Sequence, residues 1–80
     1  MKREPVISSD IKAIGYEEAA RLLEVEFHSG SIYQYSRVPL SEYRNLITSA
    51  SKGRYFASKI KNNLRYSCCQ VYPVLKSLRL

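Results

Sequence analysis

The pattern of apolar and polar positions divides the first 38 residues into three short strands. An apolar run at residues 11–16 ends in a glycine and a tyrosine, which is typical of a strand. The run LEVEF at residues 23–27 alternates apolar and acidic side chains with period two, as a half-buried strand does. Ser29 and Gly30 have turn chemistry and precede a third run, SIYQYSRV, at residues 31–38. We therefore expect an antiparallel meander of three strands.

The pattern changes to a helical period after Pro39. Proline lacks the amide donor that a sheet ladder needs, but it fits the first turn of a helix. One apolar stripe follows, made of Leu40, Tyr43, Leu46, Ile47 and Ala50. A second helix should begin near Ser51, whose hydroxyl can cap the free amides of the first turn. Its inward face should comprise Gly53, Phe56, Ala57, Ile60 and Leu64. The expected fold class is α+β, with two helices packed on one face of the three-stranded sheet.

Length and composition indicate one small globular domain. A chain of 80 residues buries only about 60% of the surface that its unfolded form exposes. We expect a flexible N-terminus at residues 1–7, a folded domain at residues 8–66 and a C-terminal extension at residues 67–80, which packs on the domain in one alternative. No apolar run approaches the roughly 18 residues of a membrane helix, and the N-terminus lacks the apolar core of a secretory signal. The sequence thus predicts a cytoplasmic monomer that does not bind membranes.

The sequence contains few residues of the types that catalyse reactions or bind metals. Cys68 and Cys69 are adjacent, so they are not expected to bridge each other, and they indicate a reducing compartment. His28 is the single histidine and Asp10 the single aspartate, which leaves no zinc-ligand spacing and no nucleophile, base and acid set. The segment SKGR has one glycine where a nucleotide-binding loop needs two. We expect no catalytic residue, no metal and no cofactor.

Positive charge is concentrated in the second half of the chain. The net charge is +6, yet residues 1–40 carry five basic and six acidic side chains. Residues 41–80 carry eight basic side chains and a single acidic one, Glu42. Such an asymmetry favours RNA or another single-stranded nucleic acid as a partner.

The second helix is the expected surface for a nucleic acid. At about 100° per residue, Arg54, Lys61 and Arg65 form one basic stripe opposite the core side. Lys52 and Arg54 lie near the helix start, where free amides favour an anion, and Gly53 lets the backbone come close. The predicted nucleic-acid-binding residues are Lys52, Gly53, Arg54, Tyr55, Ser58, Lys59, Lys61 and Arg65. The alternative is a basic face that only keeps the protein soluble.

Several spaced motifs together resemble the KTSC domain, the module named for the C-terminus of some lysyl-tRNA synthetases. They are SSDIKAIGY, LEVEF, a glycine turn, the signature Tyr33-Gln34-Tyr35, VP and SKGRYF, in this order over residues 8–66. The family also occurs as free-standing small bacterial and phage proteins, and the resemblance implies such a member with an RNA-binding role. It implies no established activity. The chain departs from the family pattern at Ala57, where the family usually has Asn.

Alternation along the third strand places Tyr33 and Tyr35 on one side. They are either core residues whose hydroxyls reach a polar rim, or a platform on which RNA bases stack. Glu24 and Glu26 would lie on the open face of the sheet and repel phosphate, which favours the core interpretation.

The C-terminal extension carries the second functional hypothesis, a protein-interaction module. Its apolar residues are Val71, Tyr72, Val74, Leu75, Leu78 and Leu80. They either pack on the domain, for example as an added strand, or offer an apolar patch or a sheet edge to a protein partner.

Overall fold

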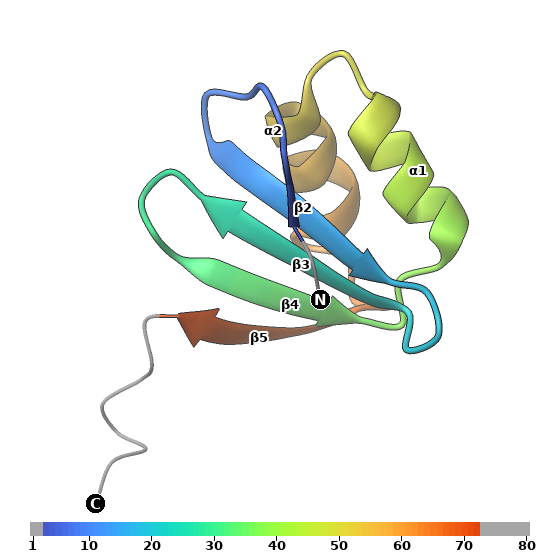
Figure 1. The fold of residues 1–80 in the computed structure, drawn as a ribbon. Coiled ribbons are helices and arrows are strands. Elements are labelled where there is room, and N and C mark those ends of the chain that lie inside the picture. Colours follow the sequence, from blue (N-terminus) through green and yellow to red (C-terminus); the bar gives the residue numbers. More distant parts are fainter. Residues whose placement is uncertain (1–2, 73–80) are drawn as a thin grey trace, which may run out of the picture.

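The sheet of the computed structural model, which describes residues 3–72, has five antiparallel strands in the order β1-β2-β3-β4-β5 (Figure 1). The strands are β1 (Arg3–Pro5), β2 (Ile11–Glu17), β3 (Leu22–Phe27), β4 (Ile32–Ser36) and β5 (Ser67–Tyr72). The three predicted strands correspond to β2, β3 and β4, and the antiparallel α+β class is confirmed. The predicted number of three strands is wrong, because each edge of the meander gains a further strand.

The two additional strands lack the patterns by which a strand is recognised in a sequence. β1 has three residues and ends in Pro5, a residue that sheets tolerate at their edges. It falls in the segment 1–7, which was expected to be flexible, and pairs with β2 through Arg3 and Gly15. β5 begins with Ser-Cys-Cys-Gln, which shows no apolar alternation, and pairs with β4. The added-strand alternative for the C-terminal extension therefore holds for Ser67–Tyr72, whereas residues 73–80 lie outside the described part.

Two helical segments follow the meander. α1 (Leu40–Thr48) begins directly after Pro39, as predicted, and buries Leu46. The second comprises α2 (Lys52–Tyr55) and a π-helical turn, η1 (Phe56–Ile60). The wider turn is closed by the Lys61 amide, which donates to the Phe56 carbonyl oxygen at 2.9 Å, five residues back.

The start and the end of the second helix differ from the sequence prediction. The Ser51 hydroxyl makes no capping hydrogen bond, and the Ser51 amide instead donates to the Ser49 hydroxyl at 3.2 Å. Phe56 and Ile60 are buried as predicted. Leu64 was wrongly assigned to the inward face, since its exposure is 101%, and Ala57 is exposed as well. The π turn alters the angular spacing of the side chains and the helix ends at Ile60, so a projection with a constant 3.6-residue period fails there.

The core lies between the helices and one face of the sheet. Its buried residues are Ile11, Ile14, Leu23, Val25, Tyr35, Val38, Leu46, Phe56 and Ile60. The Tyr16 ring stacks on the Tyr43 ring of α1, with centroids 4.7 Å apart, and thereby joins β2 to this helix. None of the helices in the described range is both long and apolar enough to cross a membrane.

Candidate nucleic-acid interface

A cleft of about 690 Å³ opens between the end of the β3–β4 hairpin and the α2–η1 segment. Its apolar and aromatic lining comes from Ile11, Phe27, Tyr33, Tyr35, Phe56 and Ala57. Its charged, amide, imidazole and thiol groups come from Asp10, His28, Lys61, Asn62 and Cys68. An apolar hollow with a few polar groups is the usual composition of a ligand site, and the volume falls in the range typical of such sites.

Four aromatic rings along this cleft hold one another edge to face. The Phe27 ring lies 5.8 Å from the Tyr33 ring and 5.5 Å from the Phe56 ring, measured between centroids. The Tyr35 ring also lies 5.5 Å from the Phe56 ring. Edge-to-face contacts fix ring orientation as well as distance. The four rings therefore form a continuous aromatic wall whose members pack on one another.

The two tyrosines of the YQY signature have different environments. Both face the helices, because Tyr33 lies opposite Val25 and Tyr35 opposite Leu23 in the register. Tyr35 is a core residue with 4% exposure, and its pKa is raised by burial and by the neighbouring Cys68. Tyr33 is only partly buried and lines the cleft. The core interpretation thus applies to Tyr35, while Tyr33 presents part of its ring to the hollow.

Loop contacts shape the rim of the cleft near the start of α2. The His28 amide donates to the Asp10 carbonyl oxygen at 3.0 Å, and the His28 Nε2 atom lies 3.0 Å from the Ser8 carbonyl oxygen. A Cβ atom on Gly53 would lie only 3.3 Å from the Asp10 Oδ2 atom. The small size of Gly53 therefore admits a carboxylate of the protein itself, where the sequence had suggested an anionic ligand. This negative charge opposes phosphate binding at the helix start.

A second hollow, of about 560 Å³, adjoins the first on the other side of Asp10 and Gly53. It includes Lys52 and Arg54, two of the predicted nucleic-acid-binding residues. The residues that line both hollows are Ser9, Asp10, Gly53 and Ala57. The short Ala57 side chain therefore stands at the boundary where the two hollows meet.

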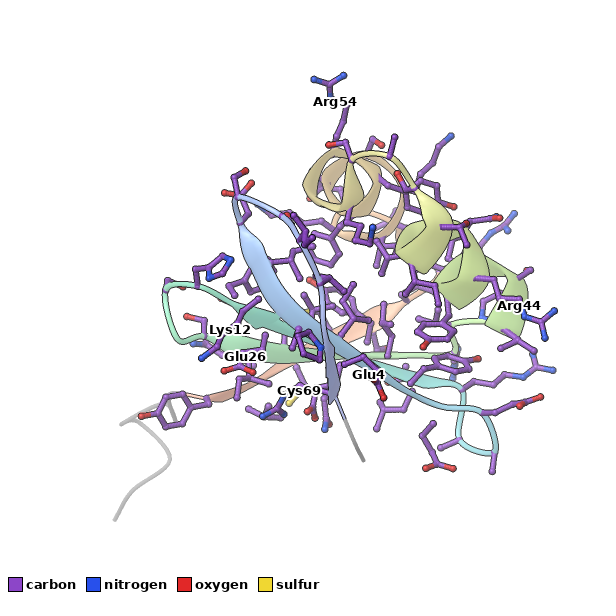
Figure 2. All side chains as sticks on the ribbon, turned by 45° about the horizontal axis from the view of Figure 1, so that its top comes forward. Glu4, Lys12, Glu26, Arg44, Arg54 and Cys69 are labelled. Carbon is purple, nitrogen blue, oxygen red and sulfur yellow. The ribbon has the colours of Figure 1, made fainter. Side chains whose placement is uncertain are left out.

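The predicted cations do not form a single helical stripe. Arg54 projects from α2 away from the sheet (Figure 2). Lys61 follows η1 and lines the first cleft, whereas Arg65 lies in a turn beyond the helix end. Lys59 is exposed, and the Lys52 ammonium donates to the Ser49 carbonyl oxygen at 3.2 Å. Arg54 and Lys52 therefore line the second hollow and Lys61 the first, whereas Lys59 and Arg65 are exposed and line neither.

Two further predicted site residues, Tyr55 and Ser58, form hydrogen bonds within the protein. The Tyr55 hydroxyl donates to Glu42 at 2.6 Å, and the same carboxylate accepts from the Tyr66 hydroxyl at 3.1 Å. Burial, followed by the Glu42 carboxylate, raises the pKa of both phenols. The Ser58 hydroxyl donates to the Arg54 carbonyl oxygen at 2.9 Å. Tyr55 therefore packs toward α1 and does not flank the exposed cations as a stacking surface.

The open face of the sheet is polar and electrically balanced. Glu24 is only 6% exposed and accepts hydrogen bonds from Arg3 and, at 2.8 Å, from the Gln34 amide. Arg3 also donates to Glu26 at 3.2 Å, and Lys12 lies 3.9 Å from Glu26 (Figure 2). Two carboxylates and two cations thus neutralise each other, so these four groups of the described residues give this face no net positive charge.

No pattern in the sequence marks Asp10, His28, Asn62 and Cys68 as members of one site. They are distant in sequence, and only the folded chain collects them around the cleft. The proximity of Asp10 and His28 could have been predicted, because the start of one strand and the end of its antiparallel neighbour lie at the same end of a sheet. Asp10 and His28 flank β2 and β3 in this way. Nothing comparable marks Asn62 or Cys68.

The described residues hold no cluster of three or more metal-ligating side chains of the His, Cys, Asp and Glu type. Cys68 and Cys69 are both exposed free thiols. Cys68 lies opposite Tyr35 on the helix side, whereas Cys69 lies opposite Gln34 and faces the open side (Figure 2). The chemistry that the cleft offers is hydrogen bonding, aromatic contact and charge.

Comparison with known proteins finds similar sequences both in proteins of about this length and as a small segment of a much longer ligase. The family model of the KTSC domain matches residues 7–66. A lysine–tRNA ligase from Nostoc is 47% identical over 58 residues, which cover 72% of this chain but only 10% of the ligase. An uncharacterized protein from Stutzerimonas stutzeri is 39% identical over 61 residues, which cover 76% of this chain and 86% of that protein. The crystal structure of a KTSC domain protein from Yersinia pestis superposes with a TM-score of 0.80 at 39% identity, over 88% of this chain and 96% of that one.

Proposed function

This chain belongs to the KTSC domain family, and from that premise we propose that it is a small non-catalytic module that binds single-stranded RNA. The binding surface is the side of the molecule formed by α2, η1 and the turn that follows. The observation that carries the proposal is the distribution of charge. Arg54, Lys59, Lys61 and Arg65 are exposed within twelve residues of sequence, and no ion pair of the described residues involves them.

The acidic groups lie elsewhere in the fold or are already engaged. All three ion pairs of the described residues are on the open face of the sheet, where they involve Glu24 and Glu26. Glu42, the nearest carboxylate in sequence, accepts two tyrosine hydroxyls. Asp10 is the exception, beside the start of α2. Unneutralised cations produce a local positive potential that attracts and retains the phosphate backbone.

The relatives support RNA as the partner. The matched segment of the Nostoc protein belongs to a lysine–tRNA ligase, an enzyme that acts on tRNA. Since that segment is about a tenth of the ligase, it is a small part of the enzyme that would work beside an RNA substrate. A basic surface suits this position. Single-stranded RNA is favoured over a duplex because the cleft exposes part of an aromatic ring at the edge of the basic surface, where an unpaired base could stack.

An NMR titration with a mixed-sequence single-stranded RNA, at low and at moderate salt, tests the proposal. We expect amide shifts at Lys52, Arg54, Lys59, Lys61 and Arg65 that weaken as salt rises. Polyglutamate at the same charge concentration is the control for general polyanion binding. Absence of shifts at low salt, or equal shifts with polyglutamate, would contradict RNA binding at this surface.

A protein-docking role is the second candidate, and the position of β5 favours it. This strand is an edge of the sheet, with no neighbour on its outer side among residues 3–72. Tyr72 is 56% exposed at its end. An edge strand of this kind can accept a strand from another protein. Solution mass measured over a range of protein concentrations tests self-association through this edge, and a concentration-independent monomer would exclude it.

A further inference from the structure

We propose that the cleft between the β3–β4 hairpin and η1 binds one unstacked nucleobase, with the attached phosphate on Lys61. This inference rests on the proposed RNA-binding function and assigns a specific place to one nucleotide. It also gives Tyr33 of the YQY signature a role as the surface on which the base packs. The observations that carry it are the aromatic wall, the separation of charge along the cleft and the volume of about 690 Å³.

The aromatic wall offers a base a preformed surface. Tyr33 is the partly exposed member of the cluster, and its ring is held edge to face by Phe27 at 5.8 Å. Phe27 is in turn held by the buried Phe56 at 5.5 Å. A ring fixed in this way loses little conformational freedom when a base packs against it. Base stacking on aromatic side chains is a common means by which proteins bind single strands.

The charges around the cleft orient a nucleotide. Asp10 lies beside Gly53 near the start of α2, whereas Lys61 and Asn62 follow the end of η1. The Asp10 carboxylate repels phosphate and can accept a hydrogen bond from an amino or imino group of a base. The Lys61 ammonium attracts phosphate, and the Asn62 amide can both donate and accept. The base is therefore directed toward the hairpin end, and its phosphate toward Lys61 and the remaining cations.

The two adjacent cysteines allow occupancy of the cleft to be measured. Cys68 lines the cleft, and Cys69 faces the opposite side of the sheet. Both thiols are free and exposed, so both can be alkylated. The Cys69→Ser variant reports on the cleft through Cys68. The Cys68→Ser variant is the matched control, with a thiol one position along the same strand.

The experiment measures the alkylation rate of each single-thiol variant with iodoacetamide, with and without millimolar 5′-mononucleotides. We expect a nucleotide to slow the alkylation of Cys68 at least about fivefold and to leave that of Cys69 unchanged. Ribose 5-phosphate and inorganic phosphate, which lack a base, should protect neither thiol. Equal rates with and without nucleotide, protection by phosphate alone, or equal protection of Cys69 would overturn the proposal.

A substitution at an exposed position separates this proposal from general RNA binding. Ala57→Leu adds bulk at the cleft from an exposed helical site, so the fold should persist, which circular dichroism checks. We expect this variant to lose nucleotide protection of Cys68 and to bind RNA more weakly, with the salt dependence of the wild type, because the cations are unchanged. If the wild-type protein binds RNA but nucleotides do not protect Cys68, the base site is overturned and the proposed RNA-binding function is not. Protection of Cys68 by mononucleotides without RNA binding would support the base site and overturn the proposed function.

Discussion

The buried carboxylate of Glu24 gives the fold a specific dependence on pH. Burial opposes its ionisation, but the hydrogen bonds from Gln34 and Arg3 and the Arg3 charge outweigh burial and hold its pKa below the ordinary 4.5. The substitution Glu24→Gln keeps the shape of the side chain and removes the charge. Among the described residues, Arg3 then retains only Glu26, at 3.2 Å, as a charged partner.

The expected loss of stability follows from the exposure of the pair. Breaking a fully buried ion pair costs about 3–5 kcal/mol, whereas a surface pair contributes about 0–1 kcal/mol. The Glu24 side chain is 8% exposed and the Arg3 side chain 32%, so solvent screens one partner and not the other. We therefore expect Glu24→Gln to lower the free energy of unfolding by about 1–2 kcal/mol at pH 7. For a chain of this size this corresponds to a melting temperature roughly 4–16 °C lower.

The sign of the pH effect is fixed by the direction of the pKa shift. A carboxyl whose folded pKa is lowered contributes stability above its unfolded pKa, and this contribution is lost as the pH falls through the folded value. The wild type should therefore exceed Glu24→Gln in free energy of unfolding by the whole amount at pH 7, and this difference should decrease below about pH 4.5. Urea denaturation followed by circular dichroism at pH 7 and pH 3 measures it. The control is Glu4→Gln, which removes an exposed carboxylate from β1. Equal stability of Glu24→Gln and wild type at pH 7, or an undiminished deficit at pH 3, would refute the reasoning.

Two further predictions test the helical region by denaturation. Ile60→Ala should lower the free energy of unfolding by about 2–5 kcal/mol, since Ile60 is fully buried, whereas Leu64→Ala should change it by at most about 0.5 kcal/mol. Equal losses would mean that the helix continues past its π turn with an ordinary period. Tyr55→Phe, which removes the donor to Glu42, should lower the free energy of unfolding by about 1 kcal/mol at pH 7. Because the folded pKa of Tyr55 is raised, this contribution is present below about pH 10 and is lost as the pH rises through the folded value. A deficit that does not decrease between pH 9 and pH 11.5 would contradict the assigned hydrogen bond.

Strand positions were predictable where one face of the sheet is buried. Leu23, Val25 and Phe27 alternate with acidic residues, so period two and the Ser29-Gly30 turn suffice to predict β3 and the hairpin that it forms with β4. The edge strands were not predictable in the same way. β1 contains a proline and β5 begins with Ser67 and two cysteines, and both are held by backbone pairing with a neighbour that only the folded chain supplies.

The candidate site was predictable in its charge and not in its shape. The surplus of basic residues after position 41 is evident in the sequence, and the exposure of Arg54, Lys59 and Lys61 agrees with it. The direction of Tyr55 was missed, because its hydrogen bond to Glu42 depends on how α2 packs against α1. The cleft is lined by residues as far apart in the sequence as Asp10 and Cys68, and a local sequence pattern does not predict that such residues lie close together.

Salt dependence of RNA binding tests the central claim most directly. The variant Arg54→Glu/Lys61→Glu removes two cations that border the hollows. The control variant Arg21→Glu/Arg44→Glu reverses two exposed cations that line neither hollow. Each reversal removes two units of charge, so both variants have a net charge of +2 in place of +6.

The measurement is the dissociation constant for a single-stranded RNA over a range of salt concentrations. We expect the first variant to bind more weakly and the slope of log affinity against log salt to be shallower by about 1.4, or about 0.7 for each phosphate that no longer pairs with a cation. The control should keep the slope of the wild type. Equal slopes for all three proteins, or an equal change in both variants, would contradict RNA binding at this surface.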